Sequence, residues 1–178
     1  GVSDDEVSEA LNFSSPHYFA AGATLFGAEA QGAYQFEGQD YNGRNYHARN
    51  METCTDCHNT HMLIVEYDLC TDCHENVESR EDIFLIRLEE DEDIEPVDYD
   101  GDGDALEPIR DEIMTLHTAL YAEIQTYAAD VLGAPVIYAE AYPYWFNDLN
   151  GDGAADPDEV NYGNRFASWS PNMLRSAY

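Results

Sequence analysis

The stretch CTDCHNTHMLIVEYDLCTDCH, residues 54–74, contains all four cysteines of the chain in two identical five-residue words. Each word is a Cys-x-x-Cys pair with a histidine directly behind it. Two cysteine pairs at this spacing fit a structural zinc site or two short disulfides. Only covalent attachment of c-type haem requires the histidine, because both thiols bond to the porphyrin and the histidine then binds the iron.

We therefore interpret the two words as attachment sites for two haem c groups. Each site consists of two thiols and a proximal histidine: Cys54, Cys57 and His58 for the first haem, and Cys70, Cys73 and His74 for the second. The segment between the words, residues 59–69, spans at most about 40 Å even when fully extended. The two haems are therefore expected to be near neighbours in one shared core.

Four further histidines, His17, His47, His61 and His117, are available as second axial ligands. His61 follows His58 too closely to reach the far face of the first haem, so we expect it to serve a neighbouring one. His47 can fold over either iron, and His17 begins an alanine-rich segment on which a porphyrin could pack. His117 is expected to be a buried core residue. Histidine on both sides of each iron, and hence a relatively low potential, is favoured over the rival ligands Met51 and Met62.

Two acidic loops have the spacing of calcium ligands. In DLNGDGAADPDE, residues 148–159, the ligand positions are filled by Asp148, Asn150, Asp152, the Ala154 carbonyl, Asp156 and Glu159. In DYDGDGDALEPI, residues 98–109, they are filled by Asp98, Asp100, Asp102 and Asp104, while the last position is Ile109. Glu107 or Asp111 is expected to substitute there. We interpret both loops as structural Ca²⁺ sites that lock loops around the haems; solvated acidic turns are the alternative.

Charge excludes two classes of partner. The chain of 178 residues has 37 Asp and Glu against 7 basic residues, a net charge of −30. Such a surface repels nucleic acid and anionic lipid. No run approaches the roughly 18 apolar residues that span a bilayer, so no membrane insertion is expected. The opening GVSDDEVSEA has no signal-peptide pattern, so a leader was cleaved or never present.

The pattern predicts a mainly α fold with long loops and little β, built as one small cytochrome c-type domain with a haem-dominated core. We expect a helix over residues 14–32, capped by Ser15 and Pro16 and ended by Gly32, then a hairpin over 33–47. An acidic loop lies near 89–93. A second helix, between residues 108 and 132, has its entry capped with help from Asp104 and is ended by Gly133. Its apolar face consists of Ile109, Ile113, Leu116, Leu120 and Ile124.

The single domain, residues 1–178, is expected to have a haem-binding part (1–90) and a part with the calcium loops and long helix (91–178). The aromatic-rich segment after residue 142 is predicted to be loop-like. Its last apolar side chains suit contacts between subunits or cover the haems within one chain: Phe166, Trp169, Met173, Leu174 and Tyr178.

Six words spread over most of the chain resemble the multihaem c-type cytochromes of the extracellular electron-transfer, filament-forming type. They are PHYFAAGATLFGAEAQGAYQFEG, YNGRNYH, TCTDCHNTH, DYDGDGD, YPYWFNDLNGDG and WSPNMLRSAY. The resemblance implies an electron carrier outside the cell or on its surface, which polymerises with copies of itself and exchanges electrons with redox proteins or extracellular acceptors. A histidine of one subunit can ligate a haem in the next, which would suit His17. The chain departs from the family in having only two attachment words.

Three other functions compete. A soluble periplasmic dihaem shuttle would use the same chemistry without polymerising. A dihaem enzyme such as a peroxidase needs an open iron site, whereas histidines here exceed the number needed, so we do not expect an enzyme. A calcium-stabilised zinc module would be colourless.

Overall fold

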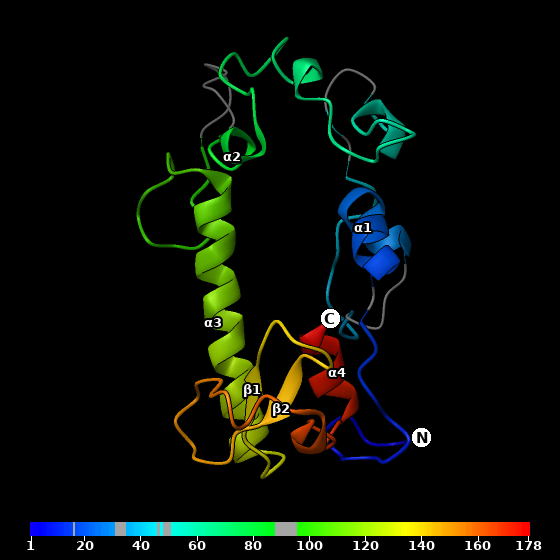
Figure 1. The fold of residues 1–178 in the computed structure, drawn as a ribbon, viewed down its shortest axis with the longest axis vertical. Helices are drawn as coiled ribbons and strands as arrows, with labels where there is room; N and C mark the ends of the chain where they lie inside the picture. The colour runs from blue at the N-terminus through cyan, green and yellow to red at the C-terminus, as the bar shows by residue number, and fades with distance from the viewer. Residues whose placement is uncertain (16, 31–34, 46, 48–50, 88–95) are drawn as a thin grey trace. The chain divides into compact units, whose positions relative to one another are not determined.

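The structure is a computed structural model that describes residues 1–15, 17–30, 35–45, 47, 51–87 and 96–178. Figure 1 shows the helices and strands of this part. The α-helices are α1 (His17–Phe26), α2 (Arg80–Ile83), α3 (Ile109–Asp130) and α4 (Pro171–Ala177), and the strands are β1 (Val136–Tyr138) and β2 (Trp145–Asn147). Short 3₁₀ helices are η1 (Gly27–Ala30), η2 (Cys54–Asp56), η3 (Tyr67–Leu69) and η4 (Tyr162–Asn164).

The chain divides into two compact units. One comprises Gly1–Asn45 and Leu120–Tyr178, and the other comprises Tyr46–Ala119. Both cysteine words and the first acidic loop belong to the second unit, and the second acidic loop belongs to the first. A single dihaem domain with a division near residue 90 stays a prediction. None of the described helices combines the length and apolar composition that crossing a bilayer would need.

The first helix is shorter than predicted because a glycine turns the chain. α1 ends at Phe26, and Gly27 follows with a left-handed φ of +47°. A Cβ at Gly27 would lie 1.9 Å from the carbonyl oxygen of Gly43, so only glycine fits this close approach. Two backbone bonds hold the segments together, Ala28 N to Asn42 O (2.9 Å) and Asn45 N to Leu25 O (2.8 Å). The predicted helix start at Pro16, the stop at Gly32 and the acidic run 89–93 lie outside the described residues.

The predicted hairpin does not form in its described part, residues 35–45 and 47, which contains no strand. A tight turn replaces it: Gln39 N donates to Phe36 O, and Gly38 has a φ of +80°. The strands lie instead further along the chain, where β1 and β2 pair antiparallel with Ile137 opposite Phe146. Three residues per strand are too few to show an alternating pattern in the sequence. The expectation that the aromatic-rich C-terminal region is loop-like is wrong, because it contains β2, η4 and α4.

Aromatic side chains from this C-terminal region contribute to the buried core of the first unit. Trp169 meets Phe166 edge to face at 5.0 Å and Trp145 at 6.2 Å. Tyr178 stacks on Phe13 at 5.1 Å. The core contains Ile124, Ala128, Val136, Trp145, Phe166, Trp169 and Met173. The expectation that Phe166, Trp169 and Met173 face other subunits or haems is therefore wrong, because these side chains are buried within their own unit.

The long helix is confirmed, but most of its apolar face is not buried. α3 spans Ile109–Asp130, and Gly133 ends it with a φ of +65° while Ala134 N donates to Ala128 O. Only Ile124 of the five predicted core positions is buried; the others are at least a third exposed: Ile109, Ile113, Leu116 and Leu120. His117 is exposed as well, which corrects its expected place in a core. Asp104 does not cap this helix but accepts a hydrogen bond from Leu106 N within the acidic loop.

The N-terminal segment is fastened to the same unit by polar contacts. The Asp5 carboxylate accepts hydrogen bonds from the Tyr127 hydroxyl (2.7 Å) and from Asn172 Nδ2 (2.9 Å). These two bonds lower the pKa of Asp5. Asp4 pairs with Arg175 at 3.1 Å. The first residues of the chain therefore contact both α3 and α4.

Candidate functional site

The two cysteine words fold into the same local shape. In the first, Cys54 O accepts hydrogen bonds from Cys57 N (3.4 Å) and His58 N (2.9 Å). In the second, Cys70 O accepts from the N–H groups of Cys73 (3.1 Å) and His74 (2.8 Å). Residues three and four apart on a helical turn are neighbours on its surface, so this turn favours a position of the first cysteine near both the second cysteine and the histidine of its word.

The segment between the words folds back on itself and brings them close. Glu66 N donates to Cys57 O at 2.9 Å, and His58 pairs with Val65 in an antiparallel bridge. Burial raises the pKa of the Cys70 thiol, and the charge of Cys57 raises it further. The two words are therefore neighbours, as the shortness of the segment between them predicts.

The His58 ring is held in one tautomer. Its Nδ1 lies 3.0 Å from the carbonyl oxygen of Leu63. A carbonyl only accepts hydrogen bonds, so Nδ1 is the donor, and in the neutral ring Nε2 has the free lone pair. A backbone partner of this kind is what a metal-binding histidine ordinarily has on its second nitrogen. The turn is fixed by Asn59 Oδ1, which accepts from the N–H groups of His61 and Met62.

His74 has a second histidine beside it. The ring centroids of His47 and His74 are 6.4 Å apart and the rings are inclined by 63°. His61 is exposed, and its backbone takes part in the turn behind the first word. His17 begins α1, and its side chain lies outside the description. Of the candidate distal ligands, the structure thus brings His47 to the second word.

The donor groups fit haem c better than zinc or disulfides. All four cysteines are free thiols, and each cysteine pair is followed directly by its own histidine. Among the described residues, the groups of three or more metal-ligating side chains that converge within 4.8 Å contain only carboxylates. The four cysteines therefore do not converge on one tetrahedral zinc position.

The two acidic loops, residues 98–109 (loop 1) and 148–159 (loop 2), have matching backbone frames. Asp98 Oδ1 and Oδ2 accept from the N–H groups of Gly101 (2.6 Å) and Gly103 (2.9 Å). Asp148 accepts from Gly151 and Gly153 at the same two distances. All four glycines have positive φ, which lets the chain wrap around the first aspartate. Burial raises the pKa of Asp98, but the bonds from Gly103 and Gly101 outweigh it and leave that pKa lowered.

In loop 2 the predicted glutamate is buried with one oxygen unpaired. Glu159 is 3% exposed, and its Oε1 accepts from Leu149 N (2.7 Å) and Asn150 N (3.3 Å). Its Oε2 is buried without a hydrogen-bond partner. A buried carboxylate oxygen that lacks a partner is costly, and a cation would offset that cost. Asn150 Nδ2 also donates to Asp152 (3.0 Å) and Asp156 (3.1 Å). Among the described residues, however, the carboxylates of loop 2 form no group of three that converges within 4.8 Å.

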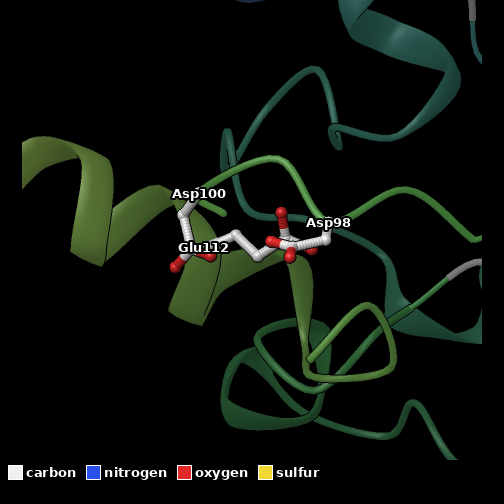
Figure 2. A group of neighbouring side chains, drawn as sticks. All are labelled: Asp98, Asp100 and Glu112. Atoms are coloured by element: carbon white, nitrogen blue, oxygen red, sulfur yellow. The ribbon is translucent and has the colours of Figure 1, made fainter. Parts of the chain in front are cut away.

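Loop 1 recruits a glutamate that the sequence pattern missed. Glu112, in the first turn of α3, is fully buried, and Figure 2 shows it facing Asp98 and Asp100. Its Oε2 accepts from Tyr99 N, the residue equivalent to Leu149 in loop 2, and its Oε1 pairs with Arg87. Glu112 therefore occupies the place that Glu159 has in loop 2. It was missed because it lies one helical turn beyond the twelve-residue loop register.

Glu107 and Asp111, the two residues expected to replace the missing last ligand of loop 1, lie in different environments. Glu107 converges with Asp100 and Asp102 within 4.8 Å, whereas Asp111 is exposed and takes part in neither converging group. Burial raises the pKa of Glu107, and the charges of Asp102 and Asp100 raise it further. The carboxylates of loop 1 thus repel one another, which is the situation that a divalent cation relieves.

Comparisons with known proteins give a distant similarity to a polyheme cytochrome. No family model and no solved structure matches the chain. The chain is 23% identical, over an alignment of 191 positions, to the "C-type polyheme cytochrome OmcB" of Geobacter sulfurreducens, in strain DL-1/KN400 and equally in strain PCA. The alignment covers 90% of this chain and 21% of the relative. The chain therefore spans about one fifth of the length of the curated proteins that it matches.

Proposed function

We propose that the chain transfers electrons through two covalently bound haem c groups. The observation that carries this proposal is the repeated backbone turn, in which the carbonyl of the first cysteine of each word accepts from the N–H groups of the second cysteine and the histidine. The tautomer of His58, with Nε2 free, supports metal ligation at the first word. The distant similarity to a polyheme cytochrome supports the same chemistry.

Each residue of the two words has a defined role in this proposal. The thiols of Cys54 and Cys57, and those of the second word, would hold the porphyrins covalently, and His58 and His74 would ligate the irons. The haem itself supplies reversible one-electron chemistry at iron. Histidines 17, 47 and 61 are the candidates for the opposite side. The net charge of −30 favours ferric over ferrous iron and so lowers the potential.

We further propose that the protein acts outside the cell as a subunit of a polymeric cytochrome, with a soluble periplasmic dihaem shuttle as the alternative. The exposed apolar positions on α3 support additional burial, by haem or by another copy: Ile109, Ile113, Leu116 and Leu120. Two haem irons have four axial positions, and the chain has six histidines. We therefore do not propose an iron with an open catalytic position.

Calcium is proposed as a structural ion in both acidic loops. The supporting observations are the buried, unpaired Oε2 of Glu159 and the converging carboxylates of loop 1. The ions would neutralise carboxylates that otherwise repel one another, and would hold the loops in one conformation.

Haem content tests the proposed function. The full chain is produced in a host that attaches c-type haem, and its mass and absorption spectrum are measured. We expect two haems per chain, one after Cys54→Ala with Cys57→Ala, and one after Cys70→Ala with Cys73→Ala. Thr55→Ala, inside the first word, is the matched control and should keep both. A colourless protein that binds zinc would contradict the proposal.

Electron microscopy then separates the polymer from the shuttle. The haem-loaded protein is imaged with calcium over a range of concentrations. Regular filaments are expected for the polymer, whereas discrete small particles at every concentration would leave the shuttle.

A further inference from the structure

We infer that His47 is the distal ligand of the iron whose proximal ligand is His74. This inference rests on the proposed function and assigns one of the two axial pairs. Both rings belong to the same compact unit, and their centroids are 6.4 Å apart. The two residues are 27 positions apart in the sequence, so no local turn places them together.

The separation is the one that two opposed ligands require. A metal–imidazole bond is about 2 Å long and the ring centre lies about 1.1 Å beyond the nitrogen, which puts each centre about 3.2 Å from the metal. Rings on opposite sides of one metal then have centres about 6.3 Å apart, whereas tetrahedral ligands bring them to about 5 Å. The observed 6.4 Å matches the opposed arrangement.

Ordinary ring packing does not account for the pair. Edge-to-face aromatic pairs occur at about 4.5–7 Å, but burial of apolar surface is what brings such rings together. His47 is exposed and His74 is only partly buried, so no packed core holds them. A bridging iron supplies a reason for two imidazoles to meet at this distance in an open site.

The assignment also limits which residues can be the distal ligand of the first haem. The ring of His58 is tied to Leu63 O within its own turn, and His47 is already used at the second word. The iron at the first word must therefore take its distal ligand from another residue. Because His61 follows His58 too closely to reach the far side of that iron, His17 is the remaining one of the three candidate distal histidines.

The test uses full-length chains that carry one haem each. The Cys54→Ala, Cys57→Ala chain keeps only the haem at His74, and the Cys70→Ala, Cys73→Ala chain keeps only the haem at His58. His47→Ala is added to each, and ferric spin state and carbon monoxide binding of the reduced protein are recorded. Loss of an axial histidine turns a low-spin iron into a high-spin iron that binds carbon monoxide.

We expect His47→Ala to convert the haem at His74 and to leave the haem at His58 unchanged. Added imidazole should restore the low-spin spectrum, and His47→Met should instead give a methionine-ligated iron with a higher potential. His117→Ala, an exposed histidine on α3, is the control and should change neither haem.

Two outcomes overturn the inference alone: conversion of the haem at His58, or no change at either haem. If the wild-type chain carries no haem, the proposed function fails and the inference fails with it.

Discussion

At the scale of single residues, each acidic loop places a buried glutamate against the backbone of its second residue, and the two glutamates come from different positions in the sequence. Glu159 and Glu112 each receive the N–H of the second loop residue and are both buried. Glu112 also pairs with Arg87, whose side chain is 14% exposed. The carboxylate of Glu112 therefore connects loop 1, α3 and the segment that precedes the loop.

Glu112→Gln is expected to lower the free energy of unfolding by about 3 kcal/mol, because it leaves Arg87 without its buried partner. It should also abolish much of the stabilisation that calcium gives to loop 1. Urea unfolding with calcium and with a chelator measures both effects. Glu123→Gln, an exposed glutamate on the same helix, is the control and should change stability by less than about 0.5 kcal/mol. Equal effects of the two substitutions would contradict the role of Glu112.

Asp5 gives the protein an acid-sensitive contact. Its pKa is lowered by the bonds from Tyr127 and Asn172, so the folded chain favours the ionised form. The resulting stability is present above the ordinary carboxyl pKa of about 4 and is lost as pH falls through the lowered folded value.

We therefore expect the stability of the wild type to fall more steeply below about pH 4 than that of Asp5→Asn, which is already weakened at neutral pH. Unfolding curves at several pH values measure the difference. Glu9→Gln, an exposed acidic residue of the same segment, should leave the wild-type slope intact. Identical slopes for wild type and Asp5→Asn would show that the contact does not matter.

At the scale of elements, one glycine decides how the segment after α1 returns to it. Gly27→Ala would place a Cβ against the backbone of Gly43, which cannot move without breaking the bonds at Asn42 and Asn45. We expect a loss of at least about 2 kcal/mol, measured by thermal and urea unfolding. Gly22→Ala, inside α1 with nothing within 4 Å of the added Cβ, should be neutral or stabilising. A similar loss at both positions would contradict this reading.

The elements also show what the sequence could and could not predict. The apolar spacing and Gly133 were enough for α3, because helix periodicity and a left-handed stop are local signals. The pairing of β1 and β2 was missed, since strands of three residues carry no period. The attachment turns and the first ligands of each acidic loop follow from spacing. Glu112 and the His47–His74 pair depend on tertiary folding, so no local pattern marks them.

At the scale of the whole molecule, the net charge of −30 opposes the compact state through self-repulsion. Salt screens that repulsion, because the Debye length falls from about 10 Å at 0.1 M to about 3 Å at 1 M. We expect the Tm to rise by about 5 °C between these concentrations, with sodium chloride as the salt and calorimetry as the measurement. The rise should shrink at about pH 5, where carboxylates begin to be protonated. A Tm that is independent of salt at neutral pH would contradict the argument.

The bond from His58 Nδ1 to Leu63 O gives the histidine of the first word a different electronic environment from that of the second. A donated N–H pushes electron density into the imidazole, which strengthens it as a ligand and stabilises oxidised iron. Among the described residues, the ring of His74 has no such backbone acceptor; its neighbour is His47. In the dihaem protein proposed here, this bond would lower the potential of the haem held by His58. The five residues of the two words are identical, so this property would come from the segment that follows the first word and not from the word itself.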